Sequence, residues 1–232
     1  MFMFKIKKID DNFAFDTDDV DYENNVFKKP LFHGTRMWLT KLSNEELTKM
    51  KEYFFKIICF YQNYYKNATK EEKDKINGFL NKIHTNTKYP CFDVGLITAP
   101  VGDYNLFEYG DIYFTASFSN AVSYSMSICG ELGNFAYICS NVIRKLNITC
   151  DKEMDNIIDY VLDLYDKYHS DERIVLVLFE CNIDDLRTES GGNDRDSLDY
   201  FLHANSASFR VKNIDKYDIY YISEEEFVKY IR

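Results

Sequence analysis

The sequence predicts a single α+β domain over residues 1–232, with short mixed strands and a helical insertion near its N-terminus. Two observations predict this class. Residues 44–84 contain two stretches with the apolar spacing of amphipathic helices, whereas residues 173–181 form a run of β-branched and other apolar residues that is typical of a buried strand. With 46% hydrophobic residues, a chain of this length can bury a substantial core.

The N-terminal third is expected to contain one strand followed by a helical hairpin. Residues 31–36 are apolar up to a glycine, a pattern typical of a strand that ends in a loop. A Ser-x-x-Glu capping box stands at residues 43–46, and a Thr-x-x-Glu box at 69–72 repeats it. Apolar residues at helical spacing follow each box, so residues 44–84 are predicted to form two helices within an insertion over 40–88.

The middle of the chain is expected to contain a long loop and four short elements. Proline and glycine are more frequent over residues 89–110, which predicts the loop. Residues 111–116 predict a strand, and residues 119–124 predict a helix with the serine at its start as the N-cap. Residues 135–139 predict a further strand, and the apolar spacing of residues 152–168 predicts an amphipathic helix.

The C-terminal third is expected to complete the sheet. The buried strand over residues 173–181 is followed by a long polar loop over 182–205 with two consecutive glycines at its centre. Residues 206–211 and 217–222 are predicted to be the last two strands. Ser223 begins an acidic Ser-Glu-Glu-Glu run that predicts the start of a short final helix.

Charge and missing motifs exclude several classes of function. A formal net charge of −10 provides no broad surface for nucleic-acid phosphates and favours protein or small-molecule partners. No apolar run approaches the ~20 residues that cross a bilayer. The four histidines lack the spacing of zinc ligands, so no metal is expected. The P-loop, the glycine-rich dinucleotide fingerprint and the Gly-x-Ser-x-Gly elbow are all missing.

The six cysteines predict a reducing environment. None of them forms a Cys-x-x-Cys pair, and several lie within apolar runs, which is typical of buried free thiols. The first residues contain no apolar stretch of signal-peptide length. We therefore expect a cytoplasmic protein, or one that reaches a host cytosol if it is a secreted effector.

Two short segments combine residue types that suit recognition of an aromatic ring bearing an amide. His33 precedes Gly34, whose backbone N–H and C=O are approachable by a flat amide such as a nicotinamide carboxamide. Tyr113 and Tyr124 belong to a strand–helix unit and can provide faces for the ring. Taken singly, a His-Gly-Thr sequence is a turn in most proteins, and an Ile-Tyr-Phe sequence is most often part of a core.

Taken together, these segments resemble the NAD-binding core of the diphtheria-toxin and PARP-like ADP-ribosyltransferases. The matching residues are His-Gly-Thr-Arg at 33–36 and Gly-Asp-Ile-Tyr-Phe-Thr at 110–115. In that family a second tyrosine lies eleven residues beyond the first, which is the separation of Tyr113 and Tyr124. The resemblance implies a split mixed or antiparallel sheet with flanking helices. It covers residues 31–38, 107–128, 173–185 and 206–222.

The resemblance also implies roles for individual residues. His33 would bond a hydroxyl of the nicotinamide ribose, and Gly34 would hold the carboxamide through its backbone. Tyr113 and Tyr124 would flank the nicotinamide ring, and Arg36, on a turn after His33, would face the pyrophosphate. The implied NAD-binding residues are His33, Gly34, Thr35, Arg36, Tyr113, Ser119 and Tyr124.

The third catalytic position departs from the family pattern. The family's polymerases carry a glutamate at the start of the penultimate strand, where Ser208 stands here, so chain elongation is not expected. The rifampin ADP-ribosyltransferases are similar in the Ser-aromatic-Arg sequence that this chain has at 208–210, and they place an aspartate in a loop after a strand that ends in glutamate. Asp185 or Asp184 would fill that place. The implied catalytic residues are His33, Tyr113, Asp185 and Ser208.

The resemblance therefore implies a mono-ADP-ribosyltransferase that uses NAD as co-substrate, releases nicotinamide and transfers ADP-ribose to one protein or small-molecule acceptor. Single transfer needs a site that holds an oxocarbenium-like ribosyl group and orients a nucleophile. The alternatives are a catalytically inactive NAD- or ADP-ribose-binding or protein-interaction module, and an NAD glycohydrolase. A 2′-phosphotransferase that acts on RNA is disfavoured, because only Arg36 and Arg210 supply positive charge near the histidine.

Overall fold

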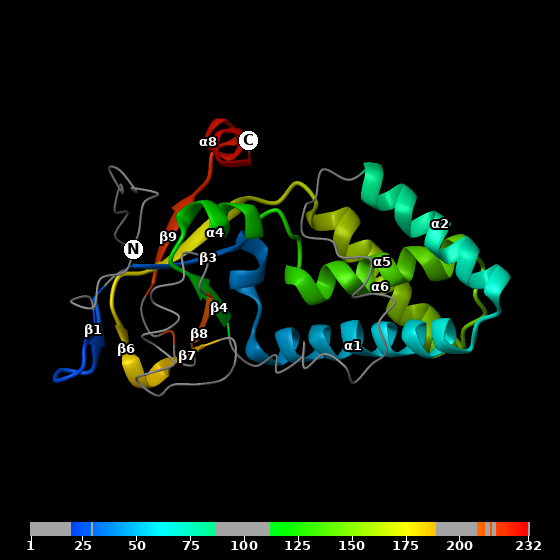
Figure 1. The fold of residues 1–232 in the computed structure, drawn as a ribbon, viewed down its shortest axis with the longest axis horizontal. Helices are drawn as coiled ribbons and strands as arrows, with labels where there is room; N and C mark the ends of the chain where they lie inside the picture. Colours follow the sequence, from blue (N-terminus) through cyan, green and yellow to red (C-terminus); the bar gives the residue numbers. More distant parts are fainter. Residues whose placement is uncertain are drawn as a thin grey trace. The chain divides into compact units, whose positions relative to one another are not determined.

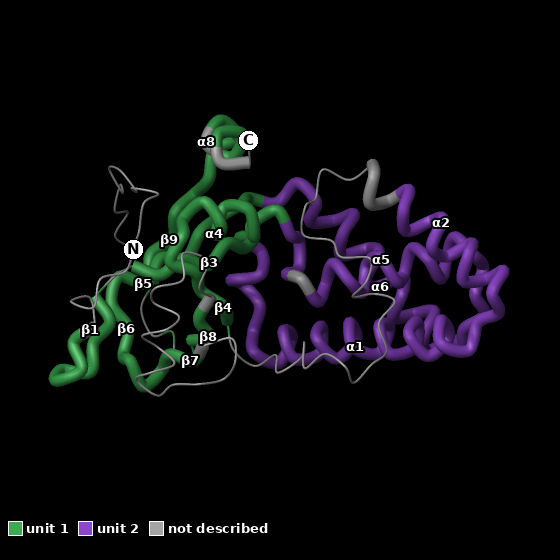
Figure 2. Tube along the Cα trace, viewed as in Figure 1, with its two compact units in different colours: residues 1–37, 106–126, 172–232 green, residues 38–105, 127–171 purple. Residues whose placement is uncertain are grey.

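The computed structural model describes residues 20–28, 30–86, 112–188, 208–211, 214 and 217–231 of the 232-residue chain (Figure 1). The predicted loop over 89–110 lies outside these residues. The chain divides into two compact units, which Figure 2 shows in different colours. Unit 1 comprises residues 1–37, 106–126 and 172–232, and unit 2 comprises residues 38–105 and 127–171. The predicted insertion thus belongs to the same unit as a segment from the middle of the chain.

Unit 1 is built on a six-stranded sheet with the order β7-β8-β4-β3-β5-β9, in which every pair of neighbours is antiparallel. The strands are β3 (Leu31–Arg36), β4 (Ile112–Thr115), β5 (Arg173–Leu178), β7 (Leu186–Thr188), β8 (Ser208–Val211) and β9 (Asp218–Tyr221). A smaller antiparallel sheet contains β1 (Val20–Asp21), β2 (Val26–Phe27) and β6 (Cys181–Asn182). Together with the helices, these sheets confirm the predicted α+β class.

The six-stranded sheet parts between β3 and β4. β3 pairs with β5 along its whole length, from Leu31 opposite Leu178 to Arg36 opposite Arg173. Among the described residues, β3 pairs with β4 at one position only, Phe32 opposite Thr115, although β4 continues in register with β8. Within the described ranges, one residue pair thus joins the two halves of the sheet, and the edge of β3 beyond Phe32 has no described ladder partner on β4.

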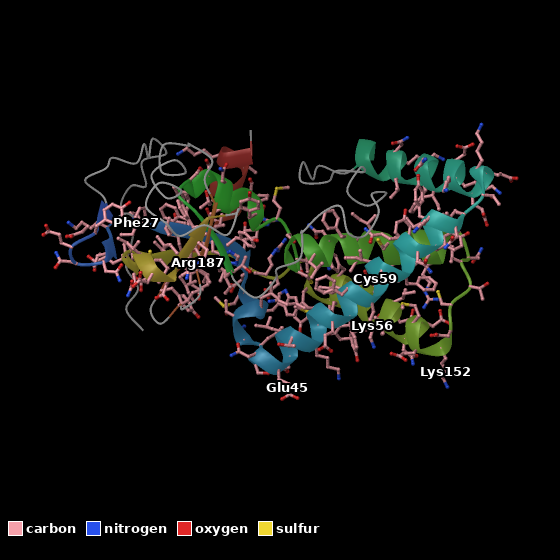
Figure 3. The ribbon with its side chains drawn as sticks, turned by 60° about the horizontal axis from the view of Figure 1, so that its bottom comes forward. Phe27, Glu45, Lys56, Cys59, Lys152 and Arg187 are labelled. Carbon is pink, nitrogen blue, oxygen red and sulfur yellow. The ribbon has the colours of Figure 1, made fainter. Side chains whose placement is uncertain are left out.

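The two faces of this sheet bury different apolar clusters. Because side chains alternate along a strand, the two faces can be followed residue by residue. One face carries Leu31, Phe114, Leu176 and Phe209, and it packs against Phe27 of β2 (labelled in Figure 3) and against η3 (Ile183–Asp185). The other face carries Phe32, Val175 and Val177. It is covered by α4 (Phe118–Tyr124) and by Phe227 of α8 (Glu224–Ile231).

Unit 2 is helical. Its described helices are α1 (Asn44–Asn67), α2 (Lys70–Asn86), α5 (Gly130–Lys145) and α6 (Lys152–Tyr168), and the 3₁₀ helix η2 (Met37–Lys41) leads into α1 from β3. The two predicted consecutive helices are confirmed as α1 and α2. The predicted capping box of α1 is also present, since the Ser43 hydroxyl accepts from the Glu46 N–H at 3.2 Å and the Glu46 carboxylate accepts from the Ser43 N–H at 2.7 Å. α1 buries the predicted apolar stripe, which includes Met50, Phe54, Ile57, Ile58 and Tyr61. None of the described helices combines the length and the apolar composition that a membrane span requires.

One predicted strand is wrong. Residues 135–139 lie within α5, where Leu132, Phe135, Ala136 and Cys139 are all buried at the three- and four-residue spacing of a helix. A five-residue apolar run looks the same in a buried strand and in a buried helix, and only the longer window separates the two.

Three predicted boundaries also change. The strand predicted over 173–181 ends at Leu178, and Cys181 already belongs to the smaller sheet. The predicted loop over 182–205 contains η3 and the edge strand β7 over its first residues, and the remainder from 189 lies outside the described residues. A three-residue edge strand is too short to show an alternating pattern. Finally, the strand predicted to end at a glycine near residue 34 continues to Arg36.

Candidate functional site

His33 lies where β3 and β4 part, and it bridges the two strands. Its Nδ1 is 2.7 Å from the carbonyl oxygen of Tyr113, which is in β4. Because a carbonyl oxygen can only accept, Nδ1 carries the proton, and Nε2 of the neutral ring is then an acceptor. Burial of the ring lowers the pKa of His33 to about 4, outweighing the bond to Tyr113, which favours the charged form. At neutral pH, His33 therefore offers an acceptor nitrogen suited to a hydroxyl group.

Gly34 allows α4 to lie directly on β3. A Cβ atom at this position would be 1.6 Å from the carbonyl oxygen of Ala121 and 2.8 Å from the backbone nitrogen of Ser125. Only glycine permits this approach. The sequence predicted a glycine whose backbone a ligand can reach. The structure adds that one side of Gly34 is closed by α4, whereas the edge toward β4 has no ladder partner among the described residues.

Thr35 and Arg36 are buried in β3. Thr35 is paired with Ile174 and Arg36 with Arg173 across β5, and the two side chains are 8% and 3% exposed. Arg36 was predicted to lie on a turn. It is instead the last residue of the strand, because β3 continues past Gly34. Its guanidinium Nη2 donates to the carbonyl oxygen of Met126 at 3.1 Å, directly after α4. In the structure, the arginine predicted to face a pyrophosphate contacts the protein backbone.

The two candidate tyrosines belong to the face of the sheet that α4 covers. Tyr113 alternates with Phe114, which belongs to the cluster on the opposite face, and it shares its face with Thr115 and Phe32. By register, Tyr113 takes the position of β4 opposite Gly34, two residues beyond the pair of Phe32 and Thr115. Tyr124 is the last residue of α4 and is 52% exposed. The structure thus brings Gly34, Tyr113 and the end of α4 to one face.

The histidine ring begins on the other face. His33 lies beside Phe114, with ring centroids 5.5 Å apart, and it reaches the backbone of Tyr113 rather than the tyrosine ring. The candidate residues are therefore divided between the two faces of the sheet, and they meet at the edge where β3 and β4 part.

Ser119 does not cap α4, contrary to the prediction. The N-cap is Ser117, whose hydroxyl accepts from the backbone N–H of Asn120 at 3.2 Å. The hydroxyls of Ser117 and Ser119 are 2.9 Å apart. The helix starts earlier than predicted. Its first residue, Phe118, is buried in the cluster that α4 forms with Phe32 and Val175 of the sheet, so the first turn of the helix lies on the sheet. Ser119 is instead the second residue of α4.

The two candidate aspartates lie on η3, which follows β6 and precedes β7. The Asp184 carboxylate accepts from the side-chain amide of Asn25 at 2.7 Å, and Arg187 (labelled in Figure 3) donates to the Asp184 carbonyl at 2.8 Å. Asp185 follows on the same turn and is half-buried. η3 precedes β7, which the strand order separates from β4 by β8.

Ser208 occupies a different position, next to β4. It is the first residue of β8, opposite Thr115, so it lies one strand from Tyr113. Position 208 is thus on the strand next to β4, whereas the alternative aspartates precede β7, which lies beyond β8 in the sheet.

Two features of the site were not predicted from the sequence. One is the contact of Arg36 with the end of α4. The other is Asn25, which adopts a φ of 58° and donates to both Asn182 and Asp184, thereby fixing η3 against the β1–β2 turn. Two consecutive asparagines at 24 and 25 are a turn signal that could have suggested the latter.

No family model, curated protein or solved structure matches this chain. Within the part of the chain that the structure describes, no three His, Cys, Asp or Glu side chains are close enough to hold a metal ion. No disulfide joins the five cysteines in the same ranges. The function is therefore argued from the geometry around His33.

Proposed function

We propose that the protein is a mono-ADP-ribosyltransferase that cleaves NAD and transfers ADP-ribose to a single protein or small-molecule acceptor. The observation that carries the proposal is the bond from His33 Nδ1 to the Tyr113 carbonyl at the parting of β3 and β4. This bond leaves Nε2 as an acceptor for a ribose hydroxyl, beside the edge of Gly34 for which the described part of β4 provides no ladder partner. The abundance of unbridged cysteines fits a reducing cytosol as the place of action.

The reaction needs orientation more than strong acid or base chemistry. The bond between the ribose C1′ and the nicotinamide nitrogen breaks, and its electron pair neutralises the pyridinium ring. The acceptor then forms a bond to C1′ and gives up a proton. Neutral His33 would orient the ribose through Nε2, and Tyr113 with Tyr124 would flank the leaving ring. The Gly34 backbone would hold the carboxamide of that ring.

Nicotinamide release from NAD tests the proposal. We expect His33→Ala to release nicotinamide about 10- to 100-fold more slowly, which is the value of one hydrogen bond left unmade. His169→Ala is the matched control, because Nδ1 of His169 also lies 2.7 Å from a backbone carbonyl, that of Asp166, but on an exposed turn after α6. Equal release by wild type and His33→Ala would refute the assignment of the site.

The fate of the ADP-ribose separates transfer from hydrolysis. With NAD labelled in its adenylate half, we expect label on a protein or small molecule of a lysate from the source cells. Release of nicotinamide with free ADP-ribose as the sole labelled product would indicate an NAD glycohydrolase instead.

A catalytically inactive NAD-binding module is the second candidate. It is favoured by the absence of a carboxylate at position 208 of β8 and by the bond that Asn25 makes to the Asp184 carboxylate. Such a module would bind NAD, lose that binding in Tyr113→Ala, and release no nicotinamide with any acceptor. Comparing Ser208→Ala with Asp185→Ala decides the third position in an active protein, since the variant that leaves turnover unchanged is not the catalytic partner.

A further inference from the structure

Two residues of β3 hold the C-terminal end of α4. Gly34 lets the Ala121 carbonyl and the Ser125 nitrogen lie against the strand, as described above. Two positions further along the same face, Arg36 donates to the Met126 carbonyl. Tyr124 lies between these contacts in the chain. The position of Tyr124 therefore depends on where β3 holds the helix end.

The hydrogen bond between Arg36 and the Met126 carbonyl is shielded from water. The side chain is 3% exposed and the contact is buried, so the donated hydrogen bond is not exchanged readily for one to water. The carbonyl groups at the C-terminal end of a helix carry partial negative charge, which favours a cation there. The Ser125 side chain is fully buried as well, and its hydroxyl donates to the Val122 carbonyl at 2.6 Å. Both contacts satisfy carbonyl groups at or just after the end of α4.

Arg173, the ladder neighbour of Arg36 on β5, provides an internal comparison. Its guanidinium bonds Glu224 and lies 3.8 Å from the ring centroid of Phe227, both on α8. Two adjacent arginines on one face of the sheet thus contact two different helices. We therefore expect a change at Arg36 to alter the packing of α4, and a change at Arg173 to alter the packing of α8.

We infer that Arg36 is a positioning residue that sets the place of Tyr124 by holding the end of α4, and that it does not contact the pyrophosphate of NAD. The inference rests on the proposed function for the identity of the ring that Tyr124 flanks. The local effect on α4 does not depend on that function.

Ligand fragments distinguish the two roles of Arg36. With free nicotinamide and ADP-ribose as probes in calorimetry, we expect Arg36→Met to bind nicotinamide about tenfold more weakly, like Tyr124→Ala, and to bind ADP-ribose within about twofold of wild type. The double variant should bind nicotinamide no more weakly than either single variant, because both changes remove the same ring contact. Arg36→Gln keeps a donor for the Met126 carbonyl without the charge and should recover part of the nicotinamide affinity. Loss of ADP-ribose binding in Arg36→Met and Arg36→Gln would overturn the inference, and so would multiplicative effects in the double variant.

Hydrogen exchange of the ligand-free protein tests the helix contact separately. We expect Arg36→Met to increase amide exchange over residues 118–126, and Arg173→Met, the matched control, to increase it over residues 224–231 instead. Unchanged exchange over 118–126 in Arg36→Met would overturn the inference whatever the ligand data show. If wild type binds neither NAD nor nicotinamide, the proposed function fails, and the exchange result alone decides whether Arg36 holds α4.

Discussion

Adding one methyl group at Gly34 tests how α4 lies on β3. In Gly34→Ala the new Cβ would be 1.6 Å from the Ala121 carbonyl oxygen and 2.6 Å from its carbon, and real Cβ contacts stay above 3.0 Å. Both atoms belong to the backbone of α4, so no side-chain rotation relieves the clash. The helix must move by about 1.5 Å, against the apolar cluster that Phe118 and Val122 form on the sheet.

The expected loss of stability follows from two opposing effects. Overpacking of this kind costs about 1–3 kcal/mol, and a clash with backbone belongs at the upper end. Alanine also restricts the unfolded chain, which returns about 0.4–1 kcal/mol. The net loss is therefore about 2 kcal/mol, or a decrease of about 4–8 °C in Tm for a protein of this size.

Gly78→Ala is the matched control with the opposite sign. Gly78 lies inside α2, and a Cβ there would meet nothing within 4 Å. Because alanine is about 1 kcal/mol more favourable than glycine in a helix interior, Tm should rise by about 2–4 °C if the chain unfolds as one unit.

Thermal and urea unfolding measure both variants. Far-UV circular dichroism follows both units, whereas the fluorescence of the single tryptophan, Trp38, which stacks on Tyr168, follows unit 2. If the units unfold separately, Gly34→Ala should shift the dichroism transition and leave the tryptophan transition in place. A Gly34→Ala protein as stable as wild type would refute the close packing of α4 on β3.

Three further variants test other contacts. The pKa of His33, about 4, lies below its ordinary value of 6.5, so the unfolded chain binds the proton first as pH falls. The free energy of unfolding should therefore decrease between pH 6.5 and pH 4, and urea titrations of His33→Gln should lack this part of the slope. Ser43→Ala removes the capping box of α1 and should lower the free energy of unfolding by about 1 kcal/mol, as measured by thermal unfolding. An unchanged free energy of unfolding would mean that the box does not stabilise the helix. Asn25→Gly keeps the φ of 58° but loses both side-chain bonds, so Asn25→Ala should be less stable than Asn25→Gly by about 1 kcal/mol, and the reverse order would contradict the left-handed geometry.

The candidate site could be predicted only in part. The pattern around His33, Gly34, Tyr113 and Tyr124 selected residues that the fold brings to the parting of two strands. It did not reveal that the histidine ring and Tyr113 start from opposite faces of the sheet, nor that the candidate aspartates precede a strand, β7, that β8 separates from β4. Strand order and register depend on pairings between distant segments, which no local pattern contains.

The sequence by itself determined the helices that carry their own signals. α1 was predicted from its cap and apolar stripe, and α6 from its apolar stripe alone, because both signals are local properties of a single segment. Where the local signal was short, as over residues 135–139, the predicted strand was wrong. These residues form part of a helix because of how they are buried in unit 2, which their composition does not show. Only the tertiary structure decided the contacts of Arg36, a charged side chain that the family resemblance assigned to a ligand. Its contact with Met126 joins residues 90 positions apart, and such a contact exists only after β3 and α4 have packed together.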